Sequence, residues 1–435
     1  MKTYRSYQPS GADYFEAAPE HWLVVPGMLA LTENRRDNKG MKESQVLSLS
    51  YGRIIVKAEE KLVGLVPESF ETYQLAMPGD IIIRCTDLQN DQTSLRTGLV
   101  KDRGIITSAY LCLGVREGFQ YRYVHYLLHL LDISKAIYKL GSGLRQNLSF
   151  DDFKRLPVLK PSYEEQLLIS DYLDQKSAQI DQAIQIKERQ IELLKERKQI
   201  LIQQAVTRGL DPHAPMRDSG IEWIGEIPAH WEALPSRYLF RVVRRNERDG
   251  TEPKLSVTQS SGIVLTSEMQ ENSTQAESFD TFQVCHEDDL VLNKYKAHLG
   301  VFWRAPLRGV ITNNYTVFRA LPRADSKYYE ILFHTPVYQS IFRSLVYGVT
   351  EGMMPLYTND FYSMLAIAPP KIEQIEIVAY INKKGQELDV AIKNILGQIE
   401  KLKEYKATLI NSAVTGKIKV PGVVEPTEIE EREIA

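Results

Sequence analysis

The sequence contains an internal repeat with a constant offset, and this repeat limits the possible folds of the chain more than any other feature. Residues 152–210 align with residues 360–418 at an offset of 208 residues, without a gap and with about 23 identities at 59 positions. The most similar stretches are LKERKQILIQQAVTRGL at 194–210 and LKEYKATLINSAVTGKI at 402–418. Repetition at a fixed offset indicates a structural unit that occurs more than once. We therefore expect two tandem copies of one unit.

The similarity continues towards the start of each copy. Matching residues there are Pro19 and Pro228, His21 and His230, Trp22 and Trp231, Gln74 and Gln283, and Asp80 and Asp289. Between these anchors the copies diverge and change length, because GIITSAYLCL and GVITNNYTVF match at an offset of 205. We call the residues that both copies share the frame, and the divergent segments between them the inserts. A shared frame with different inserts suits one task performed twice on different targets. The alternative is an old duplication whose halves have drifted apart.

Each copy ends in a segment with the pattern of a long helix. Residues 162–208 contain no Pro or Gly and are rich in Leu, Ile, Lys, Glu and Gln, which favour helix. Ser162 followed by Glu165 is a capping-box signature, and Gly209 and Pro212 mark the end. A helix of about 45 residues would be roughly 65–70 Å long at 1.5 Å per residue, about the length of 20 base pairs.

Apolar residues follow a heptad pattern in both segments, which is typical of a coiled-coil seam. The predicted seam residues are Leu173, Ile180, Ile184, Ile191, Leu194 and Leu201 in the first helix, and Ile381, Leu388, Ile392, Ile395, Ile399, Leu402 and Leu409 in the second. Lys187, Lys198 and Lys406 interrupt the seam, which suggests partial exposure or control of the register. Paired helices must run antiparallel, with one globular domain at each end and approximate two-fold symmetry. The alternative, that each helix covers only its own domain, is disfavoured by its length.

Length and composition bound the class of protein. At 435 residues the chain is too long for one ordinary core, and 43% hydrophobic with 25% charged residues is typical of a soluble globular protein. It has no apolar run of the roughly 18 residues that a membrane span needs, and its first residues lack the apolar stretch of a signal peptide. We therefore expect a cytoplasmic protein. The net charge of −3 predicts no general affinity for nucleic acid, so any basic surface must be local.

The sequence resembles a known family, the specificity (S) subunits of type I restriction-modification systems. The resemblance covers nearly the whole chain. Its motifs are DSGIEWIGEIPAHW at 218–231, GLRQNLSFDDFKRLPV at 143–158, the EEQ and IEQ helix starts, and the two repeated helix ends. In this family each half contains a target recognition domain followed by a long helix, and the two helices form an antiparallel coiled coil.

The resemblance implies a mixed α/β fold with two target recognition domains. The expected segments are an N-terminal segment 1–22, recognition domain 23–158, helix 159–210, linker 211–231, recognition domain 232–367, helix 368–417 and an acidic disordered tail 418–435. The tail, EPTEIEEREIA after Gly422–Val424, carries five glutamates against one arginine.

The resemblance also implies a DNA-binding function without catalysis by this chain. Each recognition domain would read one half of a bipartite, asymmetric site in double-stranded DNA, and the coiled coil would set the spacer. Two methyltransferase (M) subunits would dock on the helices and methylate adenine, and restriction (R) translocase-nuclease subunits would complete the complex. S-adenosylmethionine, ATP and Mg²⁺ would belong to those partners and no cofactor to this chain.

Motifs of catalysis and metal binding are missing from the sequence. No [DNS]-P-P-[YFW] adenine-methylation motif occurs, since APPK at 368–371 lacks the aromatic residue, and there is no G-x-x-x-x-G-K-[ST] phosphate loop. The eight histidines do not cluster with metal-ligand spacing. Cys85, Cys112 and Cys285 form no CxxC pair, so we expect them to be reduced and buried.

Candidate DNA-contacting residues are basic, amide or aromatic and lie in polar loops, mainly in the divergent inserts. Arg suits guanine and phosphate, Asn and Gln suit adenine, and Lys alternating with Tyr suits a phosphate-facing segment. The candidates are Arg35, Arg36, Arg84, Lys101, Arg103, Arg145, Gln146 and Asn147 in the first copy, and Arg244, Arg245, Lys294, Tyr295, Lys296, His298, Asn313, Asn314, Tyr315 and Thr350 in the second. Solvated surface arginines or structural turns would give the same pattern. Trp22 and Trp231 are expected to pack in the frame.

Two other functions are compatible with the sequence. A stand-alone DNA-binding regulator would bind its site without other subunits. A scaffold would use the coiled coil as a tether and its domains to bind peptides. Neighbouring genes for an adenine methyltransferase and a helicase-nuclease would favour the recognition subunit over both.

Overall fold

The chain forms two compact units, each with its own globular domain. A computed structural model describes residues 2–12, 14–58, 69–86, 88, 91, 94–140, 147–248, 250–269, 282–346 and 355–426. The units are Met1–Glu188 with Leu396–Ala435, and Arg189–Ile395. The division cuts both long helices. Each unit therefore contains one domain, the beginning of that domain's own helix and the end of the other copy's helix.

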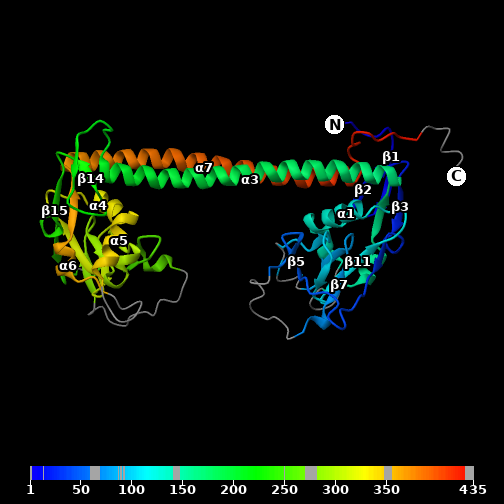
Figure 1. The fold of residues 1–435 in the computed structure, drawn as a ribbon, viewed down its shortest axis with the longest axis horizontal. Coiled ribbons are helices and arrows are strands. Elements are labelled where there is room, and N and C mark those ends of the chain that lie inside the picture. The colour runs from blue at the N-terminus through cyan, green and yellow to red at the C-terminus, as the bar shows by residue number, and fades with distance from the viewer. Residues whose placement is uncertain are drawn as a thin grey trace. The chain divides into compact units, whose positions relative to one another are not determined.

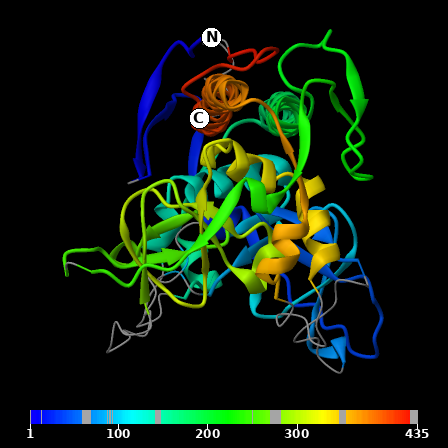
Figure 2. The same ribbon diagram turned by 90° about the vertical axis from the view of Figure 1, so that its left-hand side faces the viewer.

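The two long helices are α3, Tyr163–Arg208, and α7, Lys371–Val414. They lie side by side (Figures 1 and 2). In the first unit Lys187 and Asp181 of α3 bind Gln398 and Lys406 of α7, respectively, so residue numbers rise along one helix as they fall along the other. The predicted antiparallel pair is confirmed. All the predicted seam residues are buried or half-buried.

The predicted capping box at the start of α3 forms only in part. The Ser162 hydroxyl accepts a hydrogen bond from the Glu165 amide at 3.2 Å. The Glu165 carboxylate does not reach back, because it accepts from the Tyr4 hydroxyl and lies 3.1 Å from His21 Nε2. Glu165 therefore ties the N-terminal segment to α3. In the second copy Glu373 contacts His230 in the same way and also accepts a hydrogen bond from Trp231 Nε1.

The first unit is built around a four-stranded antiparallel sheet in the order β4-β11-β8-β9. Its strands are β1 (Tyr7–Ala12), β2 (Phe15–Pro19), β3 (Leu23–Pro26), β4 (Leu31–Glu33), β5 (Leu47–Ser50), β6 (Arg53–Val56), β7 (Gln74–Ala76), β8 (Ile81–Arg84), β9 (Thr97–Leu99), β10 (Gly104–Ile106), β11 (Tyr110–Val115) and β12 (Pro157–Lys160). Its short helices are α1 (Tyr121–Ile133) and α2 (Phe150–Lys154), with 3-10 turns η1 (Gly27–Leu29), η3 (Phe70–Thr72) and η4 (Ala136–Lys139).

The second unit repeats this sheet as β16-β23-β20-β21. Its strands are β13 (Met216–Asp218), β14 (Glu226–Pro228), β15 (Glu232–Pro235), β16 (Phe240–Val243), β17 (Leu255–Val257), β18 (Ile263–Leu265), β19 (Phe282–Cys285), β20 (Leu290–Leu292), β21 (Phe302–Arg304), β22 (Gly309–Thr312), β23 (Thr316–Ala320) and β24 (Leu365–Ala368). Its short helices are α4 (Ser326–Phe333), α5 (Pro336–Leu345) and α6 (Thr358–Ser363), with 3-10 turns η5 (Ser236–Tyr238), η6 (Thr266–Glu268) and η7 (Lys294–Leu299).

The smaller strand pairs also correspond between the units. Pairs β1-β2, β3-β12, β5-β6 and β7-β10 of the first have counterparts β13-β14, β15-β24, β17-β18 and β19-β22 in the second. The described residues between β8 and β9 differ from the segment between β20 and β21, which forms η7 in the second unit. The repeat in the sequence thus corresponds to a repeat of strand topology. In both units an insert follows the equivalent strand of the sheet, β8 or β20.

Each domain packs on both long helices, and its first helix after the sheet binds the end of the other copy's helix. The Tyr123 hydroxyl of α1 donates to the carbonyls of Leu159 and Val414, at 3.1 and 3.3 Å. In the second unit the Tyr328 hydroxyl of α4 donates to the Val206 carbonyl at 2.8 Å. Val206 and Val414 are counterparts in the repeat, so each domain holds the end of the other copy's helix.

The N-terminal part of each copy covers the end of the other copy's long helix. Trp22 is fully buried and Trp231 is 1% exposed, which confirms that both are packing residues. Gly416, at the end of α7, lies so close to Pro19 and Trp22 that a Cβ would clash with Pro19, and its φ of +71° favours glycine. Gly209, at the end of α3, lies against Pro228 and Trp231 with a φ of +76°.

The C-terminal segment differs from the expectation of disorder from residue 418 onwards. Val420 is buried in the core, the Lys419 amide donates to the Lys2 carbonyl at 2.9 Å, and Glu425 accepts from the Arg5 amide at 2.9 Å. Residues 418–426 are therefore packed on the first unit, because apolar and paired residues precede the run of glutamates. Residues 427–435 lie outside the described part of the chain.

All three cysteines are free and buried, as expected. No helix in the described part of the chain is both long and apolar enough to span a bilayer.

Candidate functional site

The two equivalent arginine pairs combine a surface residue with a structural one. The Arg36 guanidinium binds Asp80, which is 6% exposed, and Arg245 binds Asp289, which is 4% exposed. The Asp80 carboxylate also accepts from the Met77 amide at 2.8 Å, and Asp289 from the His286 amide at 2.7 Å. The hydrogen bond to Asp80 raises the pKa of Arg36. A buried carboxylate is unfavourable without such partners. Arg36 and Arg245 are therefore structural residues that stabilise the frame.

The neighbouring arginines are open to solvent. Arg35 is 81% exposed beside Glu33, at 3.0 Å, and Arg244 is exposed. Exposed ion pairs contribute little to stability and exchange partners readily. Arg35 and Arg244 are therefore free to bind phosphate in a way that Arg36 and Arg245 are not.

A second group of candidates in the first unit gathers beside the Arg35 loop. Gln45 Nε2 donates to the Arg103 carbonyl at 2.7 Å, and the Leu75 amide donates to the Arg36 carbonyl at 2.7 Å. These bonds join the loop after β4, strand β7 and the β9–β10 connection at the side of the domain away from α3 (Figure 1). Arg103 is half-exposed beside Glu43 at 3.1 Å, and Lys101 is exposed.

The insert after β8 is organised by a buried arginine that sequence reasoning missed. Arg96 is fully buried, and its guanidinium donates to the carbonyls of Thr86 and Asp91, each at 2.6 Å, and to the Tyr138 hydroxyl at 3.0 Å. The predicted candidate Arg84 binds the Asp91 carboxylate at 3.1 Å. No sequence signal separates Arg96 from a surface arginine, because its partners are backbone carbonyls.

The insert after β20 carries the basic and aromatic candidates of the second unit. Lys294 begins η7, and its ammonium lies 5.1 Å from the centroid of the Tyr295 ring. Tyr295 and Lys296 are exposed, whereas His298 is half-buried and its Nδ1 has no hydrogen-bond partner in the described part of the chain. The predicted alternation of Lys and Tyr therefore lies at the surface directly after Asn293, the counterpart of Arg84 in the repeat.

A third region is the turn that joins β22 to β23. Asn313 and Asn314 are exposed in this turn, and the carbonyl of Tyr315 accepts from Gln283 Nε2 at 2.8 Å. Gln74 makes the same bond to the Tyr110 carbonyl at 2.6 Å in the first unit. The frame thus fixes the base of the turn, while its tip is Asn-Asn in one copy and Ser-Ala in the other.

The remaining candidates divide by position. Arg145, Gln146 and Thr350 lie outside the described residues. Asn147 is described and exposed.

Two exposed arginines on adjacent strands of the second unit are absent from the predicted DNA-contacting residues. Arg241 of β16 is directly opposite Arg319 of β23 in the register, and both are exposed. Like charges directly opposite are unfavourable unless an anion or carboxylate offsets them. The first unit has Thr32 and Gly114 at these positions. Sequence reasoning could not find this pair without the strand register.

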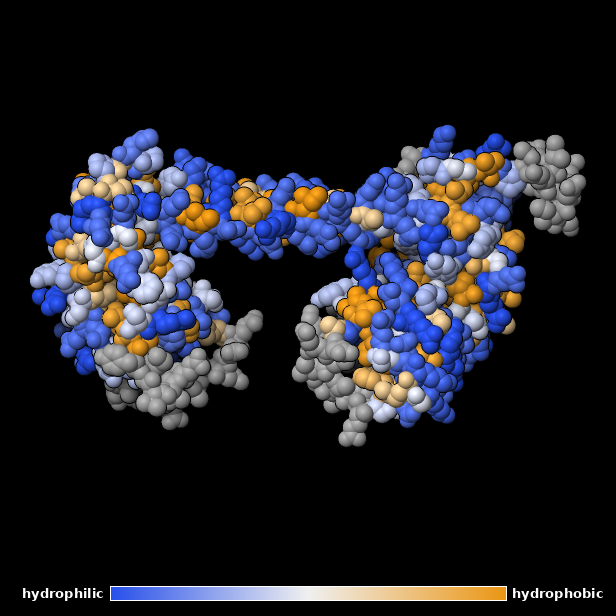
Figure 3. Space-filling view, in the orientation of Figure 1, coloured by the Kyte–Doolittle hydropathy of each residue, from blue (hydrophilic) through white to orange (hydrophobic). Residues whose placement is uncertain are grey.

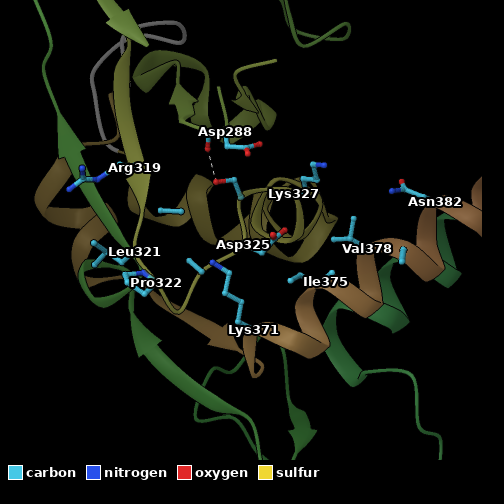
Figure 4. A pocket seen from close by; sticks show the side chains of 14 residues that line it. Asp288, Arg319, Leu321, Pro322, Asp325, Lys327, Lys371, Ile375, Val378 and Asn382 are labelled. Carbon is cyan, nitrogen blue, oxygen red and sulfur yellow. Dashed lines mark hydrogen bonds between the residues drawn. The ribbon is translucent and has the colours of Figure 1, made fainter. Parts of the chain in front are cut away.

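A groove of about 790 Å³ lies between α4, the end of β23 and the start of α7 (Figure 4). Asp288, Lys327, Lys371 and Asn382 line it, and the Ser326 hydroxyl closes one side by donating to the Asp288 carbonyl at 2.6 Å. None of the DNA-contacting residues predicted from the sequence lines this groove, but Arg319 does. Among the described residues, no group of three or more His, Cys, Asp or Glu side chains is placed to hold a metal ion.

The long helices expose apolar side chains on their outer surfaces, where hydrophobic patches interrupt a largely hydrophilic surface (Figure 3). In α3 these are Ile186, Leu193 and Ile200, each about half-exposed and seven residues apart. In α7, Val390, Leu396 and Tyr405 are exposed to a similar extent. Apolar residues at heptad spacing on a free helical face are typical of protein contacts.

Solved structures share this fold over nearly the whole chain. One, described as "Structural basis underlying complex assembly and conformational transition of the type I R-M system", has a TM-score of 0.61 and 14% identity, and the match covers 92% of this chain and 99% of that one. Another, the HsdS subunit from Thermoanaerobacter tengcongensis, has a TM-score of 0.52 and 14% identity, covering 92% and 98%. No protein-family model and no curated protein matches the chain. The likeness establishes the fold.

Proposed function

We propose that this chain is the DNA-recognition (S) subunit of a type I restriction-modification complex. The fold is that of an HsdS subunit over nearly the full length of both chains. The observation that carries the proposal is that each domain packs on both long helices and binds the end of the other copy's helix, through Tyr123 with Val414 and Tyr328 with Val206. Two domains held in this way on an antiparallel pair suit the reading of two separated DNA half-sites.

Each domain would read one half of a bipartite, asymmetric target. The frame, with Asp80–Arg36 and Asp289–Arg245, is common to both, whereas the exposed tips differ. Arg35, Lys101 and Arg103 would contact DNA in the first domain. Arg244, Lys296, Asn313 and Asn314 would do so in the second, with Arg241 and Arg319 as further phosphate contacts. Phosphate contacts would set position and the amide side chains would supply sequence information.

The helix pair would set the spacer and dock two methyltransferase subunits. The exposed apolar residues Ile186, Leu193 and Ile200 support such a docking surface. Adenine methylation and cleavage would be carried out by the M and R subunits with S-adenosylmethionine, ATP and Mg²⁺, and the chain itself would be a non-catalytic cytoplasmic protein.

Domain exchange tests the reading of half-sites. Replacing residues 23–155 with the same segment of another S subunit should change one half of the methylated motif, and replacing residues 232–363 should change the other half. If either replacement alters both halves, the domains do not read independently. Inserting one heptad into both helices should lengthen the spacer and leave both half-sites unchanged.

Co-purification tests the partners. Expressed with its methyltransferase, the chain should elute as one S subunit with two M subunits. Specific DNA binding by the chain alone, without association with M, would instead favour a stand-alone regulator.

A further inference from the structure

Three lysines interrupt the apolar seam between the two long helices. Lys187, Lys198 and Lys406 occupy positions that the heptad pattern otherwise gives to Leu, Ile or Ala. A polar side chain at a seam position weakens the pairing, and its best-attested effect is to specify the register of the helices. Each amine therefore needs a partner on the facing helix.

Two of these lysines have a carboxylate partner on the facing helix. In the second unit Lys198 Nζ lies 2.7 and 2.8 Å from the carboxylate oxygens of Asp389. In the first unit Lys406 Nζ lies 2.7 Å from Oδ1 of Asp181. The lysine side chains are 28% and 25% exposed, so the seam covers most of each.

The two ion pairs are one contact that occurs twice. Lys406 follows Lys198, and Asp389 follows Asp181, by the 208 residues of the repeat. The helix that supplies the lysine in one unit supplies the aspartate in the other. Lys187 differs, because its partner Gln398 is neutral and its repeat counterpart is Ile395.

The surroundings accommodate these pairs. Gly385 of α7 faces Lys198, and a Cβ there would be in ordinary contact with the lysine Cε, at 3.5 Å. In the first unit Arg53 of β6 binds the second oxygen of Asp181 at 2.6 Å. Asp181 thus joins both helices and the β5-β6 hairpin.

The apolar seam alone does not select one register, because a slip of seven residues again places Leu and Ile against Leu and Ile. The lysines do select one. A slip of seven residues would place Lys198 opposite Leu396 and Lys406 opposite Glu188 in one direction, or Lys198 opposite Asn382 and Lys406 opposite Asp174 in the other. Only the observed register gives both lysines a carboxylate.

We propose that the Lys198–Asp389 and Lys406–Asp181 ion pairs fix the register of the antiparallel helices and thereby the spacing of the two recognition domains along DNA. The consequence for DNA rests on the proposed function, whereas the register is a property of the chain itself. These four residues would therefore determine the spacer without touching DNA.

Engineered cysteine pairs measure the register directly, since the native cysteines are buried. Lys187→Cys with Gln398→Cys joins positions that face each other in the observed register. Lys187→Cys with Tyr405→Cys joins positions that would face each other after a slip of seven residues. The rate of disulfide formation in each full-length variant reports the population of its register. All variants, including the reference, carry Arg53→Gln, which removes the second partner of Asp181.

Lys198→Asp with Lys406→Asp places like charges at both contacts. The rate for the slipped cysteine pair should then rise at least about fivefold, and the rate for the native pair should fall. Adding Asp389→Lys and Asp181→Lys restores opposite charges and should return both rates to the reference values. Recovery by charge exchange would not follow if each residue merely filled space.

Arg189→Asp with Lys403→Asp is the matched control. It changes the net charge equally but breaks only the pairs Arg189–Glu192 and Lys403–Glu400 within single helices, so the rates should stay at the reference values. Unchanged rates in the Lys198→Asp, Lys406→Asp variant would overturn the proposal and assign the register to the domains docked at the helix ends. A chain that binds no DNA would still give the predicted cross-linking, so failure of the proposed function is distinguishable.

Discussion

The Tyr123 hydroxyl donates a hydrogen bond to the carbonyl of Val414, 3.3 Å away and 291 residues later in the chain. Its counterpart Tyr328 donates to the carbonyl of Val206 at 2.8 Å. In both units, therefore, a domain of one copy completes the end of the helix that belongs to the other copy. Neither copy contains all the contacts that hold its own helix.

Removing either tyrosine hydroxyl should destabilise the unit that contains it. Tyr123→Phe leaves the buried Val414 carbonyl without this donor, so we expect the free energy of unfolding to fall by about 1 kcal/mol. Tyr328→Phe should act similarly in the second unit. Tyr51→Phe, at a site that is 91% exposed, serves as the control. Urea unfolding of the three variants checks this, and a Tyr123→Phe variant as stable as the control would contradict the assigned contact.

The ends of the chain should tolerate being joined. The Lys419 amide donates to the Lys2 carbonyl and Glu425 accepts from the Arg5 amide, so residues 2–5 and 419–425 already lie together in the first unit. A circular permutant that begins at His213, in the exposed connection after α3, and joins Ala435 to Met1 should fold with a Tm within about 5 °C of the parent. A permutant opened at Val291, in a buried central strand, should not fold. Loss of cooperative unfolding in the first permutant would contradict the placement of the ends.

Adjacent arginines in the second domain should have different effects. Arg245→Ala leaves the buried Asp289 carboxylate without its guanidinium partner, and should lower the free energy of unfolding by about 2 kcal/mol or more. Arg244→Ala should leave stability unchanged but weaken DNA binding at all sequences and reduce the salt slope by about 1. Thermal unfolding and binding titrations at two salt concentrations separate the two effects. Equal loss of stability in both variants would contradict the division of roles.

The first domain should lose stability in acid. Burial lowers the pKa of His125 to about 3 and that of His129 to about 4, and the two rings stack with centroids 5.7 Å apart. Because both pKa values are lower in the folded state than in the unfolded chain, their contribution is complete above about pH 6.5 and is lost as the pH falls towards 4 and 3. At pH 5 the loss should be on the order of 2 kcal/mol per histidine.

A variant with His125→Gln and His129→Gln should unfold with a weaker dependence on pH between 7.5 and 5. Exposed His213→Gln is the control and should retain the parental dependence. Equal pH dependence in the double variant and the parent would show that other groups govern the acid response.

Sequence patterns predicted the architecture because the helices are long and periodic. The seam from Leu173 to Leu201 and from Ile381 to Leu409 lies at the pairing surface, and Trp22 and Trp231 are buried as expected. The roles of individual arginines could not be predicted in this way. Arg36, Arg84 and Arg96 look alike in sequence, yet one binds a buried carboxylate, one a loop carboxylate and one mainly backbone carbonyls. Such partners depend on how distant segments meet.

For the acidic tail, the sequence predicted less order than the structure shows. Composition predicted disorder from residue 418, but Val420 and the pairs of Lys419 and Glu425 order the first part of it. Averaging charge over the tail concealed the apolar residue that anchors it. For the helical seam, the interrupting lysines were visible in the sequence, but only the structure identifies Asp181 and Asp389 as their partners.

The most direct measurement of the central claim is the map of methyladenine in DNA from cells that express the methyltransferase with or without this chain. With the chain present, single-molecule sequencing should reveal adenine methylation in one bipartite, asymmetric motif with a fixed spacer, and this motif should disappear when the chain is absent. An identical methylation pattern in both samples would contradict the proposal that this chain supplies the DNA specificity.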